Sequence, residues 1–590
     1  MPRLVRIAAA IWLSCVSLAC HRKPSIPFAL LEEDFVFTML AFSPVTAAAQ
    51  GYHTHQGKDL DTALDDVSLA SVDARRSYLS AFHQRLAPID PEQLASEDRA
   101  DYEIIQGIIA SQLFDLDIEQ SWRHNPTVYV ELAGAAVFNP YVLNYAPTAD
   151  RARHIIARLG KMPIFFDQAK RNLSAAPAVW IAVARQENQG TIDLIGKTLR
   201  TFIPEDQRAA YDQASAGALA SLQSFDSFLG ELLTRQTKNG KDPDWRLGDL
   251  NYKTKFRFAL GTDQAPDDVL KAAEADVKAV RGRMNTLAGQ ILKSHGQNAK
   301  NDAAADIKAA LDLIAERKST ADTYFADARA DLSEAKSFAD ARHLLTLPRR
   351  ENLQVIETPV FLRGIYGVGG FNSAPALQPA LGAFYWITPI PATWEKSRVE
   401  SKLREYNFYN LKLLTIHEAM PGHYVQGEYG NDVQPRTRRV LRTVWGNTPY
   451  TEGWAQYITQ VMLDQGFLEG APEIRITFLK QELRVLANAI MDIRLHTNRM
   501  TEQQAMDLME KDTFQEHEEA VAKWQRAQLS SGQLPAYFVG WRDWRRVRAQ
   551  YEGAKGSAFQ AAAFHDAALK EGAVPMPELF RLLTGKELAK

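Results

Sequence analysis

The sequence predicts a mainly α-helical, two-lobed protein with a small β-sheet, and three observations support this prediction. The chain has 590 residues, whereas single hydrophobic cores stop growing at about 250–300 residues. Apolar residues recur at helical spacing over most of residues 60–345. Residues 355–391 are instead rich in Val, Ile, Phe, Tyr, Gly and Pro, which favours strands and turns. We therefore expect a helical lobe over residues 21–350 and a second lobe over 351–590.

Residues 1–20 have the pattern of an export signal. Arg3 and Arg6 precede an apolar stretch that is shorter than the ~20 residues of a membrane-spanning helix. Cys20 follows Leu18-Ala19, as at the cleavage site of a lipoprotein, although Ser17 stands where a leucine is usual. A plain signal peptide and an uncleaved anchor are the alternatives. We expect a lipoprotein of the cell envelope or a periplasmic protein, with a membrane contact only through this N-terminal anchor.

Composition excludes two classes of function. Cys15 and Cys20 are the only cysteines of the chain and both lie in this N-terminal segment, so the mature domain has no disulfide and no thiol nucleophile. Sixty-eight basic against 71 acidic residues give a net charge of −3. Without an excess of positive charge we expect no nucleic-acid partner.

The helices are expected in a clear order along the chain. Acidic residues 32–34 precede an apolar face and predict the first helix within residues 30–50. The clearest helix is 267–295, which follows Pro266 and ends before Gly296. Residues 355–391 are the best strand candidate, and Phe384–Thr388 within them is either a substrate-pairing edge or part of a hairpin packed on helices. Beyond residue 400 the expected helices are 398–426, 449–467, 472–498, 501–530 and 534–553.

One constellation points to a metal site. His417-Glu418 is followed by His423, and Glu452 comes about thirty residues later in a Glu-Gly-Trp-Ala element. A hydrolytic zinc site needs three protein ligands, an open position and a nearby carboxylate. We expect one Zn²⁺ held by His417, His423 and Glu452. Glu418 would be the general base, or alternatively a carboxylate that orients a ligand histidine.

The spacing of the two histidines differs from that of the common His-Glu-x-x-His helix. Six residues correspond to roughly 600° of helical rotation, so the two rings would point about 120° apart on an undistorted helix. Pro421 lacks the amide that would bond to the carbonyl of residue 417, and Gly422 tolerates unusual backbone angles. We expect the helix to break at Pro421-Gly422 and to bring His423 back toward His417.

These motifs resemble those of the bacterial domain-of-unknown-function (DUF) 885 family, regarded as predicted zinc metallopeptidases of the gluzincin type. The resemblance covers nearly the whole mature chain. Ser531 departs from it, because the family usually has proline there. Besides the zinc motifs, it rests on Trp-Arg-Leu-Gly at 245–248, Gly-Ala-Phe-Tyr-Trp-Ile-Thr-Pro at 382–389, Met-Asp-Ile-Arg-Leu-His at 491–496, Gly-Gln-Leu-Pro-Ala-Tyr-Phe-Val-Gly at 532–540 and Phe-His-Asp-Ala-Ala-Leu-Lys-Glu-Gly at 564–572. The resemblance implies a helical zinc-peptidase-like fold with the active site in the second lobe.

Five further residues are candidates for the site. His496 could donate to a developing oxyanion with Asp492, four residues earlier, fixing its tautomer; Asp492 could instead bond to a ligand histidine, and the two could be an ordinary surface pair. Tyr537 could stabilise a tetrahedral intermediate or belong to the core. Arg526 could bind a substrate carboxylate or form a structural ion pair. Tyr385 is the expected substrate contact of the strand.

The sequence leaves three functions open. The first is an exported zinc metallopeptidase acting on oligopeptides. The second is a zinc hydrolase of a non-peptide amide, and the third is a catalytically silent envelope-binding protein. An intact Glu418 argues against the third, because a binding protein needs no general base. No residue pattern indicates an oligomeric state.

Overall fold

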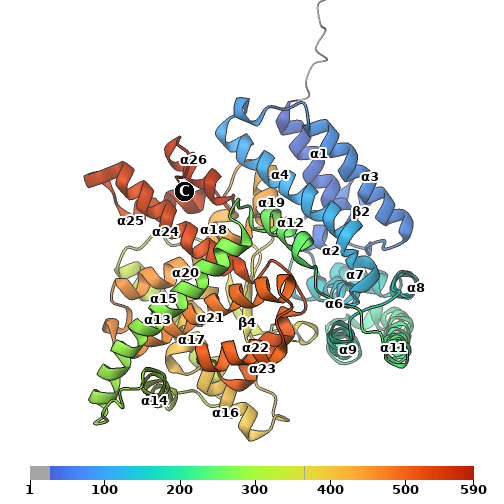
Figure 1. The fold of residues 1–590 in the computed structure, drawn as a ribbon. Coiled ribbons are helices and arrows are strands. Elements are labelled where there is room, and N and C mark those ends of the chain that lie inside the picture. Colours follow the sequence, from blue (N-terminus) through green and yellow to red (C-terminus); the bar gives the residue numbers. More distant parts are fainter. Residues whose placement is uncertain (1–26, 364–365, 590) are drawn as a thin grey trace, which may run out of the picture.

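The computed structural model describes residues 27–363 and 366–589. The chain is mainly helical with a small sheet, as predicted (Figure 1). The expected signal segment 1–20, with Cys15 and Cys20, lies outside the described residues.

Helices fill the first part of the chain up to residue 341. The predicted first helix is α1, and the predicted helix 267–295 is α13, which begins at Pro266 with Asp267 and Asp268 in its first turn. The helices of this part are α1 Phe28–Ala41, α2 Pro44–Ala49, α3 Leu69–Leu86, α4 Ser96–Phe114, α5 Ser121–His124, α6 Thr127–Val142, α7 Thr148–Leu159, α8 Met162–Asn172, α9 Ala178–Asp193, α10 Arg200–Phe202, α11 Arg208–Lys238, α12 Asp249–Leu260, α13 Pro266–Ser294, α14 Ala303–Ala315 and α15 Tyr324–Ala341.

A three-stranded sheet follows at the predicted place. Its strands are β3 Leu353–Glu357, β4 Gly369–Asn372 and β5 Ala383–Ile387, in the spatial order β3-β5-β4. β5 pairs in parallel with β3 and antiparallel with β4. All five residues of β5 are buried, so the expected exposed edge is not β5: the strand is central, and β4 is an edge. A small antiparallel hairpin of two two-residue strands, β1 Thr54–His55 and β2 Lys58–Asp59, was not predicted.

The second part of the chain is again helical, with more breaks than predicted. The span 398–426 holds three helices rather than one, because Asn407 caps a new helix by accepting bonds from the amides of Tyr409 and Asn410. The span 501–530 holds two. The helices are α16 Lys396–Glu405, α17 Phe408–Glu418, α18 His423–Gly430, α19 Arg436–Val444, α20 Thr448–Asp464, α21 Pro472–Thr497, α22 Glu502–Asp507, α23 His517–Ala527, α24 Pro535–Lys555, α25 Ala561–Lys570 and α26 Met576–Thr584.

The hydrophobic core consists of three large clusters among the described residues. One joins α1, α3 and α4 to the sheet, α17, α20 and α24. A second joins α12, α13 and α14 to α21 and α24. A third holds α6 to α11 together with Phe361. Each cluster contains residues from both sides of residue 350, so the predicted boundary there does not divide the core.

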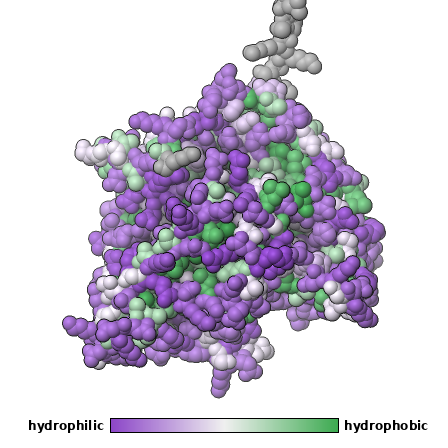
Figure 2. All heavy atoms as spheres, viewed as in Figure 1, coloured by the Kyte–Doolittle hydropathy of each residue, from purple (hydrophilic) through white to green (hydrophobic). Residues whose placement is uncertain are grey.

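The face shown in Figure 2 is mostly hydrophilic, with hydrophobic side chains gathered in small groups. Within residues 27–363 and 366–589, no helix has the length and the apolar character needed to cross a membrane.

Candidate metal centre

The break between α17 and α18 brings the two histidines of the motif together. α17 ends at Glu418, and α18 begins at His423. The imidazole rings of His417 and His423 have centroids 4.7 Å apart and are inclined by 84°. The helix therefore breaks at Pro421-Gly422 as predicted, and the break compensates for the six-residue spacing.

Gly422 makes this turn possible. Its amide donates to the carbonyl of Ile416 at 2.9 Å. A Cβ at this position would lie 1.9 Å from the carbonyl oxygen of His417 and 2.3 Å from that of Ile416, so no larger residue fits without moving the backbone. The turn is also held from α20, where the indole N–H of Trp454 donates to the carbonyls of Pro421 at 3.1 Å and Gly422 at 3.3 Å.

Glu452 meets both histidines from α20. Its Oε2 lies 3.6 Å from Nε2 of His417 and 3.5 Å from Nε2 of His423. Burial favours the protonated carboxyl, but the two imidazoles outweigh it and lower the pKa of Glu452 to about 2. Burial alone would lower the pKa of His423, but the carboxylates of Glu452 and Glu418 outweigh it and raise that pKa to about 9. The geometry thus concentrates negative charge at a point where the two ring nitrogens converge.

The three donor atoms fit a zinc ion. Ligand atoms at the usual ~2.0–2.1 Å from a tetrahedral Zn²⁺ are separated from one another by about 3.3 Å, close to the 3.5 and 3.6 Å measured here. Oε2 of Glu452 is buried and has no hydrogen-bond partner among the described residues, which a buried carboxylate rarely lacks. Glu418 belongs to the same group: ligand atoms of Glu418, His417 and His423 lie within 4.8 Å of one another.

Tyr537 reaches this group from α24. Its ring lies 6.4 Å from that of His417, nearly parallel at 22°. Burial, with the Glu452 and Glu418 carboxylates adding to it, raises the pKa of Tyr537 well above its usual value, so the phenol keeps its proton. α20 and α24 cross where Gly453 meets Gly540: a Cβ on Gly453 would lie 2.3 Å from the carbonyl carbon of Gly540. This close crossing places Tyr537 beside Glu452.

The group opens into a cavity of about 880 Å³. Its lining includes His417, Glu418, His423, Glu452 and Tyr537, and also the glycines of β4. α9, from the N-terminal part of the chain, contributes as well, since Gly190 lets that helix pack directly on the backbone of Phe361. Among the residues that the structure describes, β4 pairs only with β5. Phe371 of β4 lies 6.4 Å from the ring of His423, so an edge strand runs beside the candidate ligands.

Tyr385 does not lie in this cavity, and its predicted substrate contact is wrong. The side chain is fully buried, and its hydroxyl lies 3.1 Å from that of Thr415 on α17. Because β5 is the central strand, its residues are covered on both faces. The contact instead fixes the sheet against the helix that carries His417.

Asp492 and His496 are also outside the cavity lining of the described residues. Asp492 accepts hydrogen bonds from the hydroxyl of Tyr252 at 2.6 Å and from the amide of Gly532 at 3.0 Å. The His496 ring stacks on Tyr252 at 5.1 Å and accepts from the amide of Leu247 at 3.2 Å. The pair is therefore neither at the surface nor in the cavity lining: it joins α12 and the residues before it to α21.

Arg526 does line the cavity. Its guanidinium donates to Ser530 Oγ at 2.9 Å and to Gln533 Oε1 at 3.2 Å, and no carboxylate of the described residues lies within 4 Å of it. The structural ion pair considered for Arg526 is thus not present in this part of the chain. His565 lies elsewhere, between Tyr457 and the carbonyl of Leu344.

Sequence reasoning missed three groups of this site. Lys402 and Lys523 line the cavity beside Arg526, and the only available signal was the i,i+3 spacing of Lys523 and Arg526 on one helix. Trp454 is a buried residue whose indole also holds the turn before His423, a contact that the sequence does not reveal. β4 was not predicted separately, because the residues of β5 are more apolar and gave the stronger strand signal.

Comparisons with known proteins agree with this architecture. A structure from Shewanella oneidensis, described as "a putative lipoprotein of unknown function", is 27% identical, has a TM-score of 0.77 and covers 95% of this chain and 100% of its own. The crystal structure of "the putative lipoprotein from Colwellia psychrerythraea" is 18% identical and shares the fold, with a TM-score of 0.76, 95% of this chain and 98% of its own covered. No curated protein matches the chain. The model of the family described as bacterial protein of unknown function (DUF885) matches residues 44–583, and the chain therefore belongs to the DUF885 family.

Proposed function

We propose that this protein is an exported zinc-dependent metallopeptidase that hydrolyses oligopeptides. The observation that carries the proposal is the position of Glu452, whose Oε2 lies 3.6 Å from Nε2 of His417 and 3.5 Å from Nε2 of His423, with Glu418 close to both histidines and a cavity in front. Three ligands, an open side and an adjacent carboxylate are what hydrolytic zinc sites share.

Each residue of the group has a role in this proposal. His417, His423 and Glu452 would hold the ion, and zinc supplies Lewis acidity that makes water acidic near neutral pH. Glu418 accepts a proton from the attacking water and returns it to the leaving nitrogen. Tyr537 keeps its proton and donates a hydrogen bond to the oxygen on which negative charge develops.

The edge strand favours a peptide over another amide. β4 has an unpaired side among the described residues, and its Gly369, Gly370 and Phe371 line the cavity. An extended peptide can add to such an edge through main-chain hydrogen bonds. A small non-peptide amide has no repeating backbone that would use this edge, so the peptidase accounts for more of the site.

Export to the cell envelope is part of the proposal. It is supported by the signal pattern that ends at Cys20 and by the description of two similar structures as putative lipoproteins. A peptidase anchored there would act on peptides of the periplasm or the envelope surface.

The test is the Glu418→Gln variant together with metal analysis. Glutamine keeps the shape of the side chain but cannot accept a proton, so we expect retained zinc and a loss of roughly 10²–10⁴ in the rate of peptide cleavage. Glu518→Gln is the matched control, since Glu518 lines the same cavity but pairs with Arg398 at 3.2 Å. The readouts are zinc content per chain and cleavage of a peptide library.

Two results would overturn the proposal. Near-native turnover of Glu418→Gln would remove Glu418 from the reaction. Cleavage of N-acyl amino acids with no cleavage of any peptide would favour the non-peptide amide hydrolase.

A further inference from the structure

The cavity carries an excess of positive charge on the side formed by α16, α21 and α23. Lys402 comes from α16, Arg484 from α21, and Lys523 and Arg526 from α23, and all four line the cavity. Lys523 and Arg526 are three residues apart and so lie on one helix face. This group, which we call the basic subsite, is separate from the metal ligands of α17, α18 and α20.

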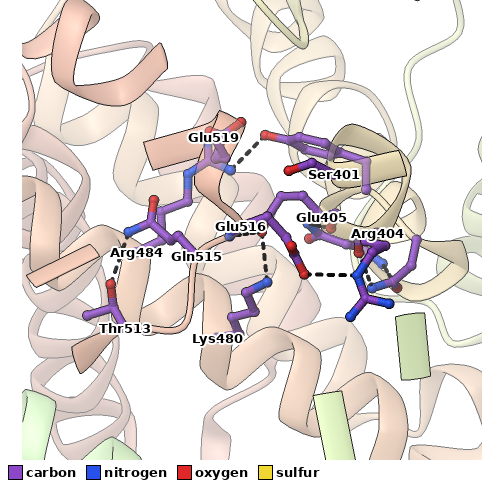
Figure 3. Close-up of polar contacts among 12 residues, drawn as sticks. Ser401, Arg404, Glu405, Lys480, Arg484, Thr513, Gln515, Glu516 and Glu519 are labelled. Carbon is purple, nitrogen blue, oxygen red and sulfur yellow. Dashed lines mark hydrogen bonds and ion pairs between the residues drawn. The ribbon is translucent and has the colours of Figure 1, made fainter. Parts of the chain in front are cut away.

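The acidic side chains nearby are already paired. Arg484 donates to the Glu519 carboxylate and, at 2.8 Å, to the hydroxyl of Tyr406. Glu405, on the adjacent helix α16, pairs with Lys480 at 2.8 Å. Figure 3 shows these contacts at the junction of α16, α21 and α23. Glu519 is thus the carboxylate that three of the four cations, Arg484, Lys402 and Lys523, share.

Three of the cations have no carboxylate partner among the described residues. Arg526 donates to Ser530 and Gln533, and Lys402 donates to the carbonyl of Gly367 at 3.0 Å. No carboxylate lies within 4 Å of Lys402, Lys523 or Arg526 in residues 27–363 and 366–589. Partly buried cations without a counter-ion are costly, so their arrangement around one cavity favours binding of an anion.

The electrostatics of the two lysines agree with this reading. Burial, strengthened by Arg484, lowers the pKa of Lys523 to about 7, although Glu519 opposes the change. Burial also lowers the pKa of Lys402 to about 8. A bound carboxylate would relieve both effects, because an opposite charge stabilises the protonated amine.

The basic subsite and the metal group line the same cavity. Arg526 donates to Gln533 at 3.2 Å, and Gln533 and Tyr537 both line that cavity. Tyr537 in turn stacks on His417. Glu452, a proposed ligand, is among the charges that act on Lys523. Because Lys523 and Arg526 line the same cavity as the hydrolytic group, one extended peptide at ~3.3–3.6 Å per residue could contact both.

We propose that Lys523 and Arg526, with Lys402 behind them, bind the C-terminal carboxylate of a peptide substrate, so that the enzyme removes one or two residues from the carboxyl end. This inference rests on the proposed peptidase function and specifies its substrate class. Arg526 offers the planar, bidentate donor that carboxylates prefer, while Lys523 supplies a second charge from the next turn.

The test compares one peptide in two forms. N-acetyl-pentaalanine with a free C-terminal carboxylate and its C-terminal amide are titrated into the full chain carrying Glu418→Gln, so that binding is measured without cleavage. We expect the carboxylate form to bind about tenfold more tightly or better, since a charge-assisted bidentate contact distinguishes the two forms. Equal affinities would overturn the inference.

Substitutions test which residues cause the tighter binding of the carboxylate form. Arg526→Gln and Lys523→Gln, singly and together, should bring the affinity ratio of acid to amide toward one, and Arg526→Lys should retain part of it. Arg398→Gln is the matched control, because Arg398 lines the same cavity but is paired with Glu518 and lies over Trp394. An equal loss in Arg398→Gln would mean a diffuse field rather than a site, and would overturn the inference.

Turnover by the zinc-loaded wild type separates this inference from the peptidase proposal. We expect kcat/KM to be at least tenfold higher for the acid than for the amide. Zinc-dependent cleavage of both forms at equal rates would leave the peptidase standing and remove the carboxylate site. A preference in binding without cleavage of either form would support the site and contradict the peptidase.

Discussion

Gly422 is the residue on which the convergence of the two histidines depends. A side chain there would meet the carbonyls of Ile416 and His417 at 2.3 and 1.9 Å, and these are backbone atoms that cannot rotate away. We expect Gly422→Ala to displace His423 and to lower zinc affinity by about 10–100-fold, the range typical of losing support for a metal ligand. Titration of zinc into the purified variant measures this.

Gly430→Ala is the control for that substitution. Gly430 ends α18, eight positions after Gly422, and a Cβ there would meet only Thr443 Oγ1 at 3.7 Å, an ordinary contact. Its zinc affinity should match that of the wild type. Wild-type affinity in Gly422→Ala would contradict the role of this turn.

Residue type and spacing in the sequence predicted that His417, His423 and Glu452 come together, and the structure places their side chains side by side, while zinc binding by them stays a prediction. The Pro-Gly pair explained how His423 could return toward His417, and the structure shows that break. The sequence alone could not show in which direction each side chain points in the folded protein. Arg526 and Lys523 differ from the paired cations in having no carboxylate within 4 Å among the described residues, which is a property of the folded chain.

Helix α21 shows at the scale of an element why Asp492 and His496 were misplaced. Gln481, Arg484, Val485 and Asn488 of this helix line the cavity. Asp492 continues nearly the same helical face. At 1.5 Å per residue, however, Asp492 lies about 6 Å and His496 about 12 Å farther along the helix axis than Asn488. Periodicity gives the face of a helix, whereas the point at which the cavity ends is set by the packing of other elements.

The local sequence signals of each helix and strand explain which elements were predicted correctly. Long helices with strong periodicity and end signals, such as α13 and α21, match their predicted bounds within two residues. The expected helix 398–426 was wrong because an internal Asn cap and a Pro-Gly break outweigh the continuing helical pattern. β5 was found by its apolar composition, but pairing order, which makes β4 an edge, has no local signal.

His565 of α25 predicts a pH dependence of stability. It is completely buried, and the neutral ring satisfies both contacts, donating from Nδ1 to the carbonyl of Leu344 at 2.7 Å and accepting at Nε2 from Tyr457 at 2.7 Å. Burial lowers the pKa of His565 from 6.5 to about 4. Since the unfolded chain takes up the proton first, the contribution is present above pH 6.5 and is lost as the pH falls toward 4.

The magnitude and the control follow from that shift. A change of one unit corresponds to about 1.4 kcal/mol, so the full loss in unfolding free energy is on the order of 3 kcal/mol. Urea unfolding at pH 7 and pH 5 should show a decline in the wild type and a smaller one in His565→Gln. His83, exposed on α3 with Arg85 in the same last turn, gives the matched control His83→Gln, which should keep the wild-type decline. Equal declines in all three proteins would contradict the assignment to His565.

At the scale of the whole molecule, the cavity is a property of both parts of the chain. Each of the three core clusters joins residues from before and after position 350, and the cavity itself is lined by α9 as well as by α17 to α24. Because of this shared packing, the N-terminal helices are part of the same hydrophobic core as the C-terminal helices. Helix α9 forms part of the wall of the cavity that His417, His423 and Glu452 line.

This enclosure predicts selection by substrate form. His417, His423 and Glu452 have side-chain exposures of 13%, 10% and 16%, so a scissile bond must enter the cavity as an extended segment. A folded protein can present such a segment only after local unfolding, which costs free energy. We therefore expect peptides of about five to fifteen residues, up to ~50 Å when extended, to be cleaved at least roughly 100-fold faster than the same sequence inside a folded domain, a difference that a local opening cost of about 3 kcal/mol produces.

The measurement uses one sequence in three forms: a free peptide, a surface segment of a stable host domain, and the same host unfolded by removal of its stabilising ligand. Cleavage should be rapid for the free peptide and slow for the folded host, and any increase on unfolding should appear only near the host's chain end if the basic subsite selects a terminal carboxylate. Glu418→Gln gives the background rate for each form. Rapid cleavage of the intact folded host, together with no activity on the free peptide, would show that the cavity does not govern access and would exclude an oligopeptidase.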